Sequence, residues 1–407
     1  MKAIIKKPAN KGTVKAIASK SVAHRMLIAK ALSSYKSTII YSDTSEDIEA
    51  TARCLEALTS PQDKVKQLYC GESGSTLRFL LPVAAARGVE CDFHMEGRLP
   101  QRPLSPLYEE MCAHGCSLSA QGTNPLHLSG QLAGGTYTIP GNISSQYITG
   151  LLFALPIASE DSRINIEGRL ESSPYIDLTL QALLKSGIRV KLEEGGFTVP
   201  GSQEYRMQGE HHVEGDWSNA AFWLCMSAMT GGGISCSGLD MNSRQGDRRI
   251  IDVLQSMGGV AIEDKASVAI EVPAGRLNGA VIDASEIPDL VPAIAAAAAS
   301  AAGQTVIKNA GRLRLKESDR LRTVSTVLAE LGADISELSD GLVITGTGSL
   351  RGGSVSSFGD HRIAMMAATA ACISSAEVDI SGAEAVNKSY PGFYRDYCSL
   401  GGEIDID

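Results

Sequence analysis

Aromatic residues are scarce in this chain: they make up 5% of its 407 residues, whereas hydrophobic residues as a whole make up 43%. The core must therefore be built mainly from Ala, Leu, Ile and Val. A charged content of 20% is typical of a globular protein and not of a disordered one. Because single cores rarely grow beyond roughly 250 to 300 residues, the length predicts two domains.

Long hydrophobic runs are also missing. The longest, Leu290 to Ala302, is rich in Ala and falls short of the roughly 20 residues that a membrane-spanning helix needs. The basic N-terminal segment, MKAIIKKPANKG, is not followed by the apolar core of a signal peptide. We therefore expect a soluble cytoplasmic protein with no membrane partner.

Positive charge is in deficit, with a formal net charge of -9. Since nucleic-acid binding depends on cationic contacts with phosphate, nucleic acid is not an expected partner, and any basic site must be local. The nine cysteines form no CxxC pair, which favours scattered reduced thiols. The sequence Cys112-Ala-His114-Gly-Cys116 offers three zinc ligands, but a structural site usually has four and a different spacing, so ordinary helix-end packing is expected there.

One element recurs six times. A short loop of Gly, Ser, Asp or Asn, often with a cation, leads directly into an apolar run that resembles a helix. Most copies are spaced by about seventy residues, the pattern of a repeat protein. The copies are marked by Ser21, Ser75, Ser145, Ser218, Asp289 and His361. Because these runs have no polar stripe, we expect buried helices.

Short strand-like runs and further helix candidates lie between the copies. The strand candidates include 38–41, 164–166, 190–192, 343–345 and 378–380, and the helix candidates are 48–57, 176–184, 249–257 and 320–331. Each repeat is thus expected to be an α/β sandwich. The predicted fold is an inside-out α/β barrel in two domains, with three repeats around a core of buried helices in each.

The small polar residues at the starts of these helices have two interpretations. As N-caps they stabilise a helix by about 1 kcal/mol each, and capping is what we expect of Ser218 and Asn219. Capping does not account for a cation, which opposes the helix dipole, so such a cation indicates a site for an anion. The cations in question are Lys20, Arg25, Arg78 and Arg362.

Nine segments, in order along nearly the whole chain, resemble those of the EPSP synthase family. They are SKSVAHR (19–25), GESGSTLR (71–78), QRP (101–103), SSQ (144–146), SSPYID (172–177), IPD (287–289), LKESDR (315–320), GDHR (359–362) and NKSYPGF (387–393). The resemblance implies an enzyme that transfers the enolpyruvyl group of phosphoenolpyruvate to the 5-hydroxyl of shikimate 3-phosphate through a tetrahedral intermediate. This reaction belongs to the biosynthesis of chorismate and aromatic amino acids, and needs no metal or other cofactor.

The resemblance also implies a domain organisation. Each domain would contain three βαβαββ units, and the two would close over the substrates. Residues 1–18 and 214–407 would form one domain, with the phosphoenolpyruvate side and the catalytic carboxylates. Residues 19–213 would form the other, with most contacts to shikimate 3-phosphate. A monomer is expected.

Each substrate is assigned a set of residues by the resemblance. For phosphoenolpyruvate the set is Lys20, Gly74, Arg102, Gln146, Arg320, Arg362 and Lys388. For shikimate 3-phosphate it is Lys20, Ser21, Arg25, Ser144, Ser145, Gln146, Ser172, Asp289 and Lys316. Arginine can bind a carboxylate or phosphate through two parallel bonds, whereas Lys20 and Lys388 would act as mobile point charges that also move protons.

Asp289 and Glu317 are the candidate proton-transfer groups. From the residues alone, Asp289 would be an N-cap, because it opens an apolar helix. The resemblance favours a base for the substrate hydroxyl, with Glu317 serving C3 of phosphoenolpyruvate, and leaves open which carboxylate is acid or base at each step. Around Glu317, the alternative is a helix start capped by Ser318 or Asp319 with Glu317 on a solvated face, but the many cations there favour a site.

Three residues are expected beside the site: His361, Tyr175 and Arg312. His361 has the reference pKa of about 6.5 that suits a general acid, but a helix N-terminus disfavours the imidazolium, so a neutral hydrogen-bonding role is equally open. Arg312 departs from the family pattern, which has a polar contact such as Asn at that position.

Glu72 is the second departure, since the family usually has Asn there. An anion at this position would repel phosphoenolpyruvate unless it is paired, and Arg102 and Lys20 are the candidate partners.

Three other functions fit the sequence less well. UDP-N-acetylglucosamine enolpyruvyl transferases share the fold and the donor, but they carry a reactive Cys where this chain has Gly97, and Lys-Asn where it has Lys20-Ser21. A kinase or ATPase would need G-x-x-x-x-G-K-[ST], which is not found here. An inactive scaffold that binds a sugar phosphate would have no use for the candidate catalytic carboxylates.

Overall fold

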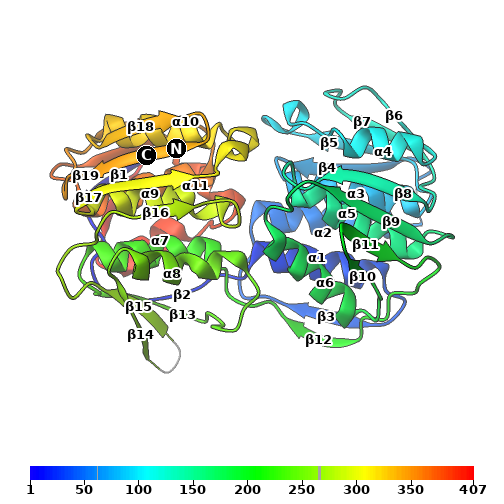
Figure 1. Ribbon diagram of the computed structural model, residues 1–407, viewed down its shortest axis with the longest axis horizontal. Helices are drawn as coiled ribbons and strands as arrows, with labels where there is room; N and C mark the ends of the chain where they lie inside the picture. Colours follow the sequence, from blue (N-terminus) through cyan, green and yellow to red (C-terminus); the bar gives the residue numbers. More distant parts are fainter. Residues whose placement is uncertain (62, 265–266) are drawn as a thin grey trace. The chain divides into compact units, whose positions relative to one another are not determined.

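The computed structural model describes residues 1–61, 63–264 and 267–407 (Figure 1). The chain divides into two compact units: unit 1 is Met1–Ser19 with Glu214–Asp407, and unit 2 is Lys20–Val213. Where the chain leaves unit 1 and returns to it, the two segments run side by side. Ala18 and Gly215 form a β-bridge, and the Ser19 N–H donates to the Glu214 carbonyl at 2.8 Å.

Unit 1 has three four-stranded sheets. The first has the order β20 (Gly353–Ser356), β21 (Val378–Ser381), β1 (Lys2–Lys7) and β22 (Glu403–Ile406). The second has the order β14 (Val260–Asp264), β15 (Ser267–Glu271), β13 (Ile234–Ser237) and β2 (Gly12–Lys15). The third has the order β16 (Val281–Asp283), β17 (Gly303–Lys308), β19 (Gly341–Gly346) and β18 (Asp334–Leu338). The N-terminal strands thus pair with strands of the C-terminal half.

Three helices pack against one another in the core of unit 1: α7 (Trp217–Met229), α9 (Val291–Ser300) and α11 (His361–Ala370). Every residue of α9 and α11 is buried. The prediction of buried helices is confirmed here, and the physical reason is composition, since Ala-rich helices can approach one another closely and have no polar face to solvate. The other helices are α8 (Ile250–Ser256), α10 (Arg320–Glu330) and α12 (Phe393–Ser399).

Unit 2 has two four-stranded sheets and one small sheet. One large sheet has the order β4 (Lys66–Gly71), β5 (Cys91–Met95), β7 (Leu126–Gly130) and β6 (Cys116–Leu118); the other has β10 (Lys191–Glu193), β11 (Gly196–Val199), β9 (Ser162–Glu167) and β8 (Thr136–Pro140). The helices are α1 (Lys20–Leu32), α2 (Glu46–Thr59), α3 (Gly74–Ala86), α4 (Leu107–Ala113), α5 (Ser145–Ala154) and α6 (Ser173–Lys185). Helices α3 and α5 pack together, and so do α1 and α6.

The third sheet of unit 2 departs from the predicted repeat. Among the described residues it contains only β3 (Ser37–Ile40) and β12 (Gly209–His212), paired in parallel. The expected βαβαββ unit would have a hairpin after its second helix, but α2 ends at Thr59 and β4 begins at Lys66. The segment between them is too short for two strands, so this repeat is truncated.

Two further expectations concern particular residues. None of the helices in the described ranges is both long and apolar enough to cross a membrane. At the helix end near Cys112 and Cys116, the His114 ring stacks on Tyr137 with centroids 3.9 Å apart, and its Nδ1 lies 2.8 Å from the Glu110 carbonyl oxygen. His114 thus packs against the end of its own helix.

Candidate active site

Arg320, the first residue of α10, is the centre of an ion-pair network in unit 1. Its side chain is 1% exposed. Its Nη1 lies 2.8 Å from Asp289 Oδ1, its Nη2 2.7 Å from Glu317 Oε2, and its Nε 2.8 Å from Asp360 Oδ2. Burial would lower the pKa of Arg320, but Asp360, Glu317 and Asp289 together raise it. One guanidinium therefore holds carboxylates from three separate loops.

Asp289 lies in the short turn η4 (Pro288–Leu290) before α9. Besides Arg320, Lys316 Nζ lies 3.4 Å from its Oδ1 and Arg362 Nη2 lies 3.4 Å from its Oδ2. Burial would raise the pKa of Asp289, but Arg362, Lys316 and Arg320 hold it well below its usual value. The N-cap interpretation of Asp289 is wrong, because Leu290 occupies the N-cap of α9 and makes no side-chain cap. The Asp289 carboxylate pairs instead with Arg320, Lys316 and Arg362.

Asp360 joins the GDHR loop to the LKESDR loop. It is the N-cap of α11, accepting a hydrogen bond from the Arg362 N–H at 3.0 Å through Oδ1. Its Oδ2 accepts from Arg320 and also from Ser318 Oγ at 3.0 Å. Ser318 therefore does not cap α10; Asp319 does, accepting from the Arg322 N–H at 3.2 Å. Glu317 is paired with Arg320, so the solvated-face alternative for it is wrong.

Four more of the predicted residues lie around this network: Arg362, Lys388, Arg312 and His361. The Arg362 guanidinium donates through Nη1 to the main-chain oxygen of Asp289 at 3.0 Å. Lys388 Nζ donates to the Gly359 carbonyl at 2.9 Å, and Arg312 Nη2 donates to the Ser285 carbonyl at 2.5 Å. His361 is buried, with its Nδ1 3.8 Å from Asp360 Oδ1. Burial lowers the pKa of Lys316, although Asp289 opposes this effect.

A separate cluster lies in unit 2, at the N-terminus of α3. It consists of Gly74, Arg78, Arg102 and Gln146. A Cβ atom on Gly74 would lie 2.6 Å from Arg78 Nη1 and 2.7 Å from Arg102 Nη1. Gln146 accepts from Arg78 Nη1 through Oε1 and donates to Ser75 Oγ through Nε2, both at 3.0 Å. A side chain at position 74 would displace the two guanidiniums that lie against the helix start. Arg78, a cation that the family sets did not include, therefore holds Gln146 in place.

Lys20 is held by a partner that the sequence did not reveal. Its Nζ lies 2.8 Å from Oδ2 of Asp47, in the first turn of α2. An acid in a first helical turn is an ordinary feature, so nothing in the sequence singled Asp47 out. Glu72, for which Lys20 was a candidate partner, has its carboxylate against Gly97: a Cβ on Gly97 would lie 2.5 Å from Glu72 Cδ. The absence of a side chain at Gly97 thus makes room for Glu72.

Arg25 is buried and joins α1 to α6. It donates to the Ser21 carbonyl at 2.7 Å, to Thr179 Oγ1 at 2.8 Å and to the Tyr175 carbonyl at 2.8 Å. Much of its hydrogen-bonding capacity therefore serves the fold, which the sequence did not indicate. Tyr175 takes part in this contact through its main-chain carbonyl and not through its side chain.

Besides Ser21 in the first turn of α1, three more serines of the predicted set lie at helix starts. Ser144 caps α5, accepting from the Gln146 N–H at 3.3 Å, and Ser145 is in the first turn. Ser172 precedes α6 with φ 56° and ψ 36°, in the left-handed region. A residue other than glycine in such a conformation costs about 1 to 3 kcal/mol, and such strained residues cluster at functional sites.

Ser218 and Asn219 are not the caps that the sequence predicts. The N-cap of α7 is Asp216, which accepts from the Asn219 N–H at 2.8 Å. Ser218 instead donates its hydroxyl hydrogen to Asp247.

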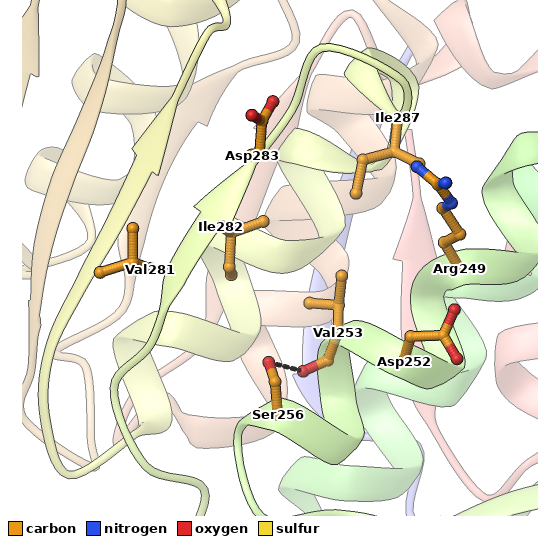
Figure 2. A pocket seen from close by; sticks show the side chains of 8 residues that line it. All are labelled: Arg249, Asp252, Val253, Ser256, Val281, Ile282, Asp283 and Ile287. Atoms are coloured by element: carbon orange, nitrogen blue, oxygen red, sulfur yellow. Dashed lines mark hydrogen bonds between the residues drawn. The ribbon is translucent and has the colours of Figure 1, made fainter. Parts of the chain in front are cut away.

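A groove outside these clusters lies between α8 and β16 (Figure 2). Its volume is about 370 Å³. Arg249 lines it beside Asp252 and Asp283, and Val253 and Ile287 supply apolar surface. None of the predicted site residues lines it, and its single cation beside two carboxylates is poorly suited to multiply charged anions.

The two units therefore present two different kinds of chemistry. Unit 1 combines the carboxylates Asp289 and Glu317 with Lys316, Arg320 and Arg362, so it can both bind anions and transfer protons. Unit 2 combines cations with helix N-termini and capping serines, which is typical of anion binding.

Comparisons with known proteins agree with this chemistry. The family model described as EPSP synthase (3-phosphoshikimate 1-carboxyvinyltransferase) matches residues 5–397. The chain is 45% identical to the 3-phosphoshikimate 1-carboxyvinyltransferase of Clostridium kluyveri, over 97% of this chain and 96% of that protein. Its structure is similar to that of the EPSP synthase from Acinetobacter baumannii, with a TM-score of 0.81, 26% identity and 100% of both chains covered. The enolpyruvyl transferase NikO from Streptomyces tendae shares the fold, with a TM-score of 0.79 and 15% identity over 99% of this chain and 98% of that one.

Proposed function

The chain belongs to the EPSP synthase (3-phosphoshikimate 1-carboxyvinyltransferase) family, and on that basis we propose which of its residues carry out the family reaction. The enzyme transfers the enolpyruvyl group of phosphoenolpyruvate to the 5-hydroxyl of shikimate 3-phosphate and releases phosphate. The observation that carries the assignment of residues is the network around Arg320, which joins two candidate proton-transfer carboxylates to cations.

Asp289 and Glu317 are the proposed proton-transfer groups. Asp289 takes the proton of the substrate hydroxyl, and Glu317 serves C3 of phosphoenolpyruvate. The cations that keep Asp289 ionised, Arg320, Lys316 and Arg362, are those proposed to bind substrate anions. A bound anion would compete with Asp289 for them and so raise the pKa of Asp289 towards the value of an effective base.

The cations of unit 1 are proposed to bind and stabilise developing charge. Arg320, Arg362 and Lys388 bind phosphoenolpyruvate, and Lys316 binds shikimate 3-phosphate. Arg320 contacts the Asp360 carboxylate, and Arg362 contacts both the carboxylate and the main-chain oxygen of Asp289, so both guanidiniums are held in place before a substrate arrives. Such preorganisation is what makes electrostatic stabilisation of a transition state effective.

Unit 2 is proposed to contribute most contacts to shikimate 3-phosphate. These come from Lys20, Ser21, Arg25, Ser144, Ser145, Gln146 and Ser172. Its contacts to phosphoenolpyruvate come from Lys20, Gly74, Arg102 and Gln146. The left-handed backbone at Ser172 supports a binding role for this residue.

The proposal also includes a monomer that acts in the cytoplasm without a cofactor. All nine cysteines are free thiols, which supports a reducing compartment.

The proposed function is tested by following phosphate release. The purified protein is mixed with phosphoenolpyruvate and shikimate 3-phosphate, and we expect release that depends on both. UDP-N-acetylglucosamine in place of shikimate 3-phosphate is the control, and it should give none. Release with the UDP-sugar alone, or no release with shikimate 3-phosphate, would refute the assignment.

Lys20 and its partner Asp47 provide a separate prediction. Lys20→Ala removes a charge proposed to contact both substrates, and should lower kcat/KM by about 10- to 100-fold, the effect of losing a hydrogen bond to a charged group. Asp47→Asn keeps that charge and loses only its ionic partner, so a decrease of less than about tenfold is expected. Steady-state kinetics of the two variants measure the difference. Equal losses would show that Lys20 acts only through its ion pair with Asp47.

A further inference from the structure

A buried carboxyl group outside the Arg320 network, that of Asp247, lies near Asp289 in unit 1. Asp247 is in the turn η3 (Gly246–Arg249) before α8, and it is 2% exposed. The Ser218 hydroxyl, in the first turn of α7, donates to its Oδ2. Helix α7 packs against both η3 and η4, so one helix lies beside the turn of Asp247 and the turn of Asp289. No motif in the sequence indicated that Asp247 or Ser218 belongs to the site.

The charged groups around Asp247 come from three elements. Asp289 faces it from η4, Arg362 from the start of α11, and Asp216 from the N-cap of α7. Burial and repulsion by Asp289 raise the pKa of Asp247 to about 6, against the opposing effects of Arg362 and the Ser218 hydrogen bond. The pKa of Asp289 is lowered by its cations. Neighbouring carboxyl groups whose proton affinities are driven apart in this way are typical of acid–base sites.

We propose that Asp247, held by Ser218, is a positioning residue for the transfer reaction, and that its charge sets how strongly Asp289 attracts the proton of the substrate hydroxyl. In the step itself, the hydroxyl O–H bond breaks and Asp289 gains the proton, while the hydroxyl oxygen bonds to C2 of the donor. The C2=C3 π bond opens at the same time, and its electrons form a C–H bond at C3 with the proton that Glu317 supplies. Ionised Asp247 repels Asp289 and shares the field of Arg362, so it strengthens Asp289 as a base. When Asp247 is protonated, it no longer repels Asp289 or competes for Arg362. The pKa of Asp289 is then lower, so Asp289 is a weaker base. The inference rests on the proposed role of Asp289.

The test is the pH profile of kcat, measured by phosphate release between pH 5 and pH 9 at saturating substrates. We expect the unmodified enzyme to show a rise in kcat with an apparent pKa of about 6. Asp247→Asn makes the position permanently neutral, so this rise should be lost and kcat at pH 8 should fall by about three- to tenfold, with KM changed less than about twofold. Ser218→Ala removes a hydrogen bond that favours the carboxylate, so the rise should move to higher pH.

The control is Asp252→Asn, which removes an exposed carboxylate of α8 that lines the groove of Figure 2. It should keep the original profile. A purely structural role would lower kcat equally at every pH without moving the rise, and that result in both Asp247→Asn and Ser218→Ala would overturn the proposal. If Asp247→Asn does not fold, as judged by circular dichroism, the shift in Ser218→Ala decides. Failure of the unmodified enzyme to release phosphate would overturn the proposed function itself.

Discussion

Asp289→Asn is expected to lower kcat by about 10²- to 10⁴-fold, the contribution of a general base, without raising KM for either substrate. Asparagine keeps the shape of the side chain but loses its charge and its ability to take a proton. Arg320, Lys316 and Arg362 then lose a competing carboxylate and become more available to substrate anions. The expected pattern is therefore a large fall in kcat with KM unchanged or lower. Steady-state kinetics of phosphate release measure both constants.

Asp334→Asn is the matched control, because it removes an exposed carboxylate of β18 in the same unit. Its kinetic constants should stay close to those of the unmodified enzyme. If Asp289→Asn kept more than about a tenth of the original kcat, the assignment of Asp289 as the base would be wrong.

Arg320→Met is expected to lower the free energy of unfolding by about 3 to 5 kcal/mol at pH 7, the usual effect of removing one partner from a buried ion pair. Methionine fills part of the space but leaves Asp289, Glu317 and Asp360 without the cation that they share. Turnover should be lost as well. Urea unfolding monitored by circular dichroism measures the change in stability.

The loss of stability in Arg320→Met should depend on pH. The folded-state pKa of Asp289 lies well below its usual value, so its contribution is present above the unfolded-state pKa and is lost as pH falls. The difference between the unmodified protein and Arg320→Met should therefore be largest at neutral pH and shrink below about pH 4. If the two proteins differed equally in free energy of unfolding at neutral pH and below about pH 4, lost packing, and not lost charge pairing, would be the cause of the destabilisation.

Arg322→Met is the control for this comparison. Arg322 is exposed two residues further along the same helix, so its replacement should change the free energy of unfolding by about 0.5 kcal/mol or less. Equal stability of Arg320→Met and Arg322→Met would contradict the structural importance of the network.

Several features of the fold were predictable because they are local. The apolar run after Asp289 has no polar stripe, and the helix that it forms, α9, is buried along its full length. Likewise, the helix predicted at 320–331 is α10, Arg320–Glu330, because its apolar period and its capping aspartate lie within one short stretch. The repeat with β3 and β12 is shorter than predicted. The repeat pattern predicts a full unit here, and in the sequence only the short distance between α2 and β4 indicates otherwise.

The sequence indicated candidate site residues, but it did not indicate which of them contact one another. The sequence suggested that Asp289 caps a helix, yet its carboxylate binds three cations from other loops. Asp47 and Asp247 looked like ordinary acids near helix starts. Each became significant only through a residue distant in the chain, Lys20 in one case and Ser218 in the other.

The sequence by itself determined the buried helices, the repeated architecture and the family, because apolar periodicity and short motifs are properties of neighbouring residues. Only the tertiary structure decided which charges meet, how Arg320 serves three carboxylates at once, and why Asp289 and Asp247 differ in proton affinity. The physical reason is that an ion pair or a pKa depends on distance and burial in space. The loops that carry these groups are separate in the sequence, and folding alone brings them together.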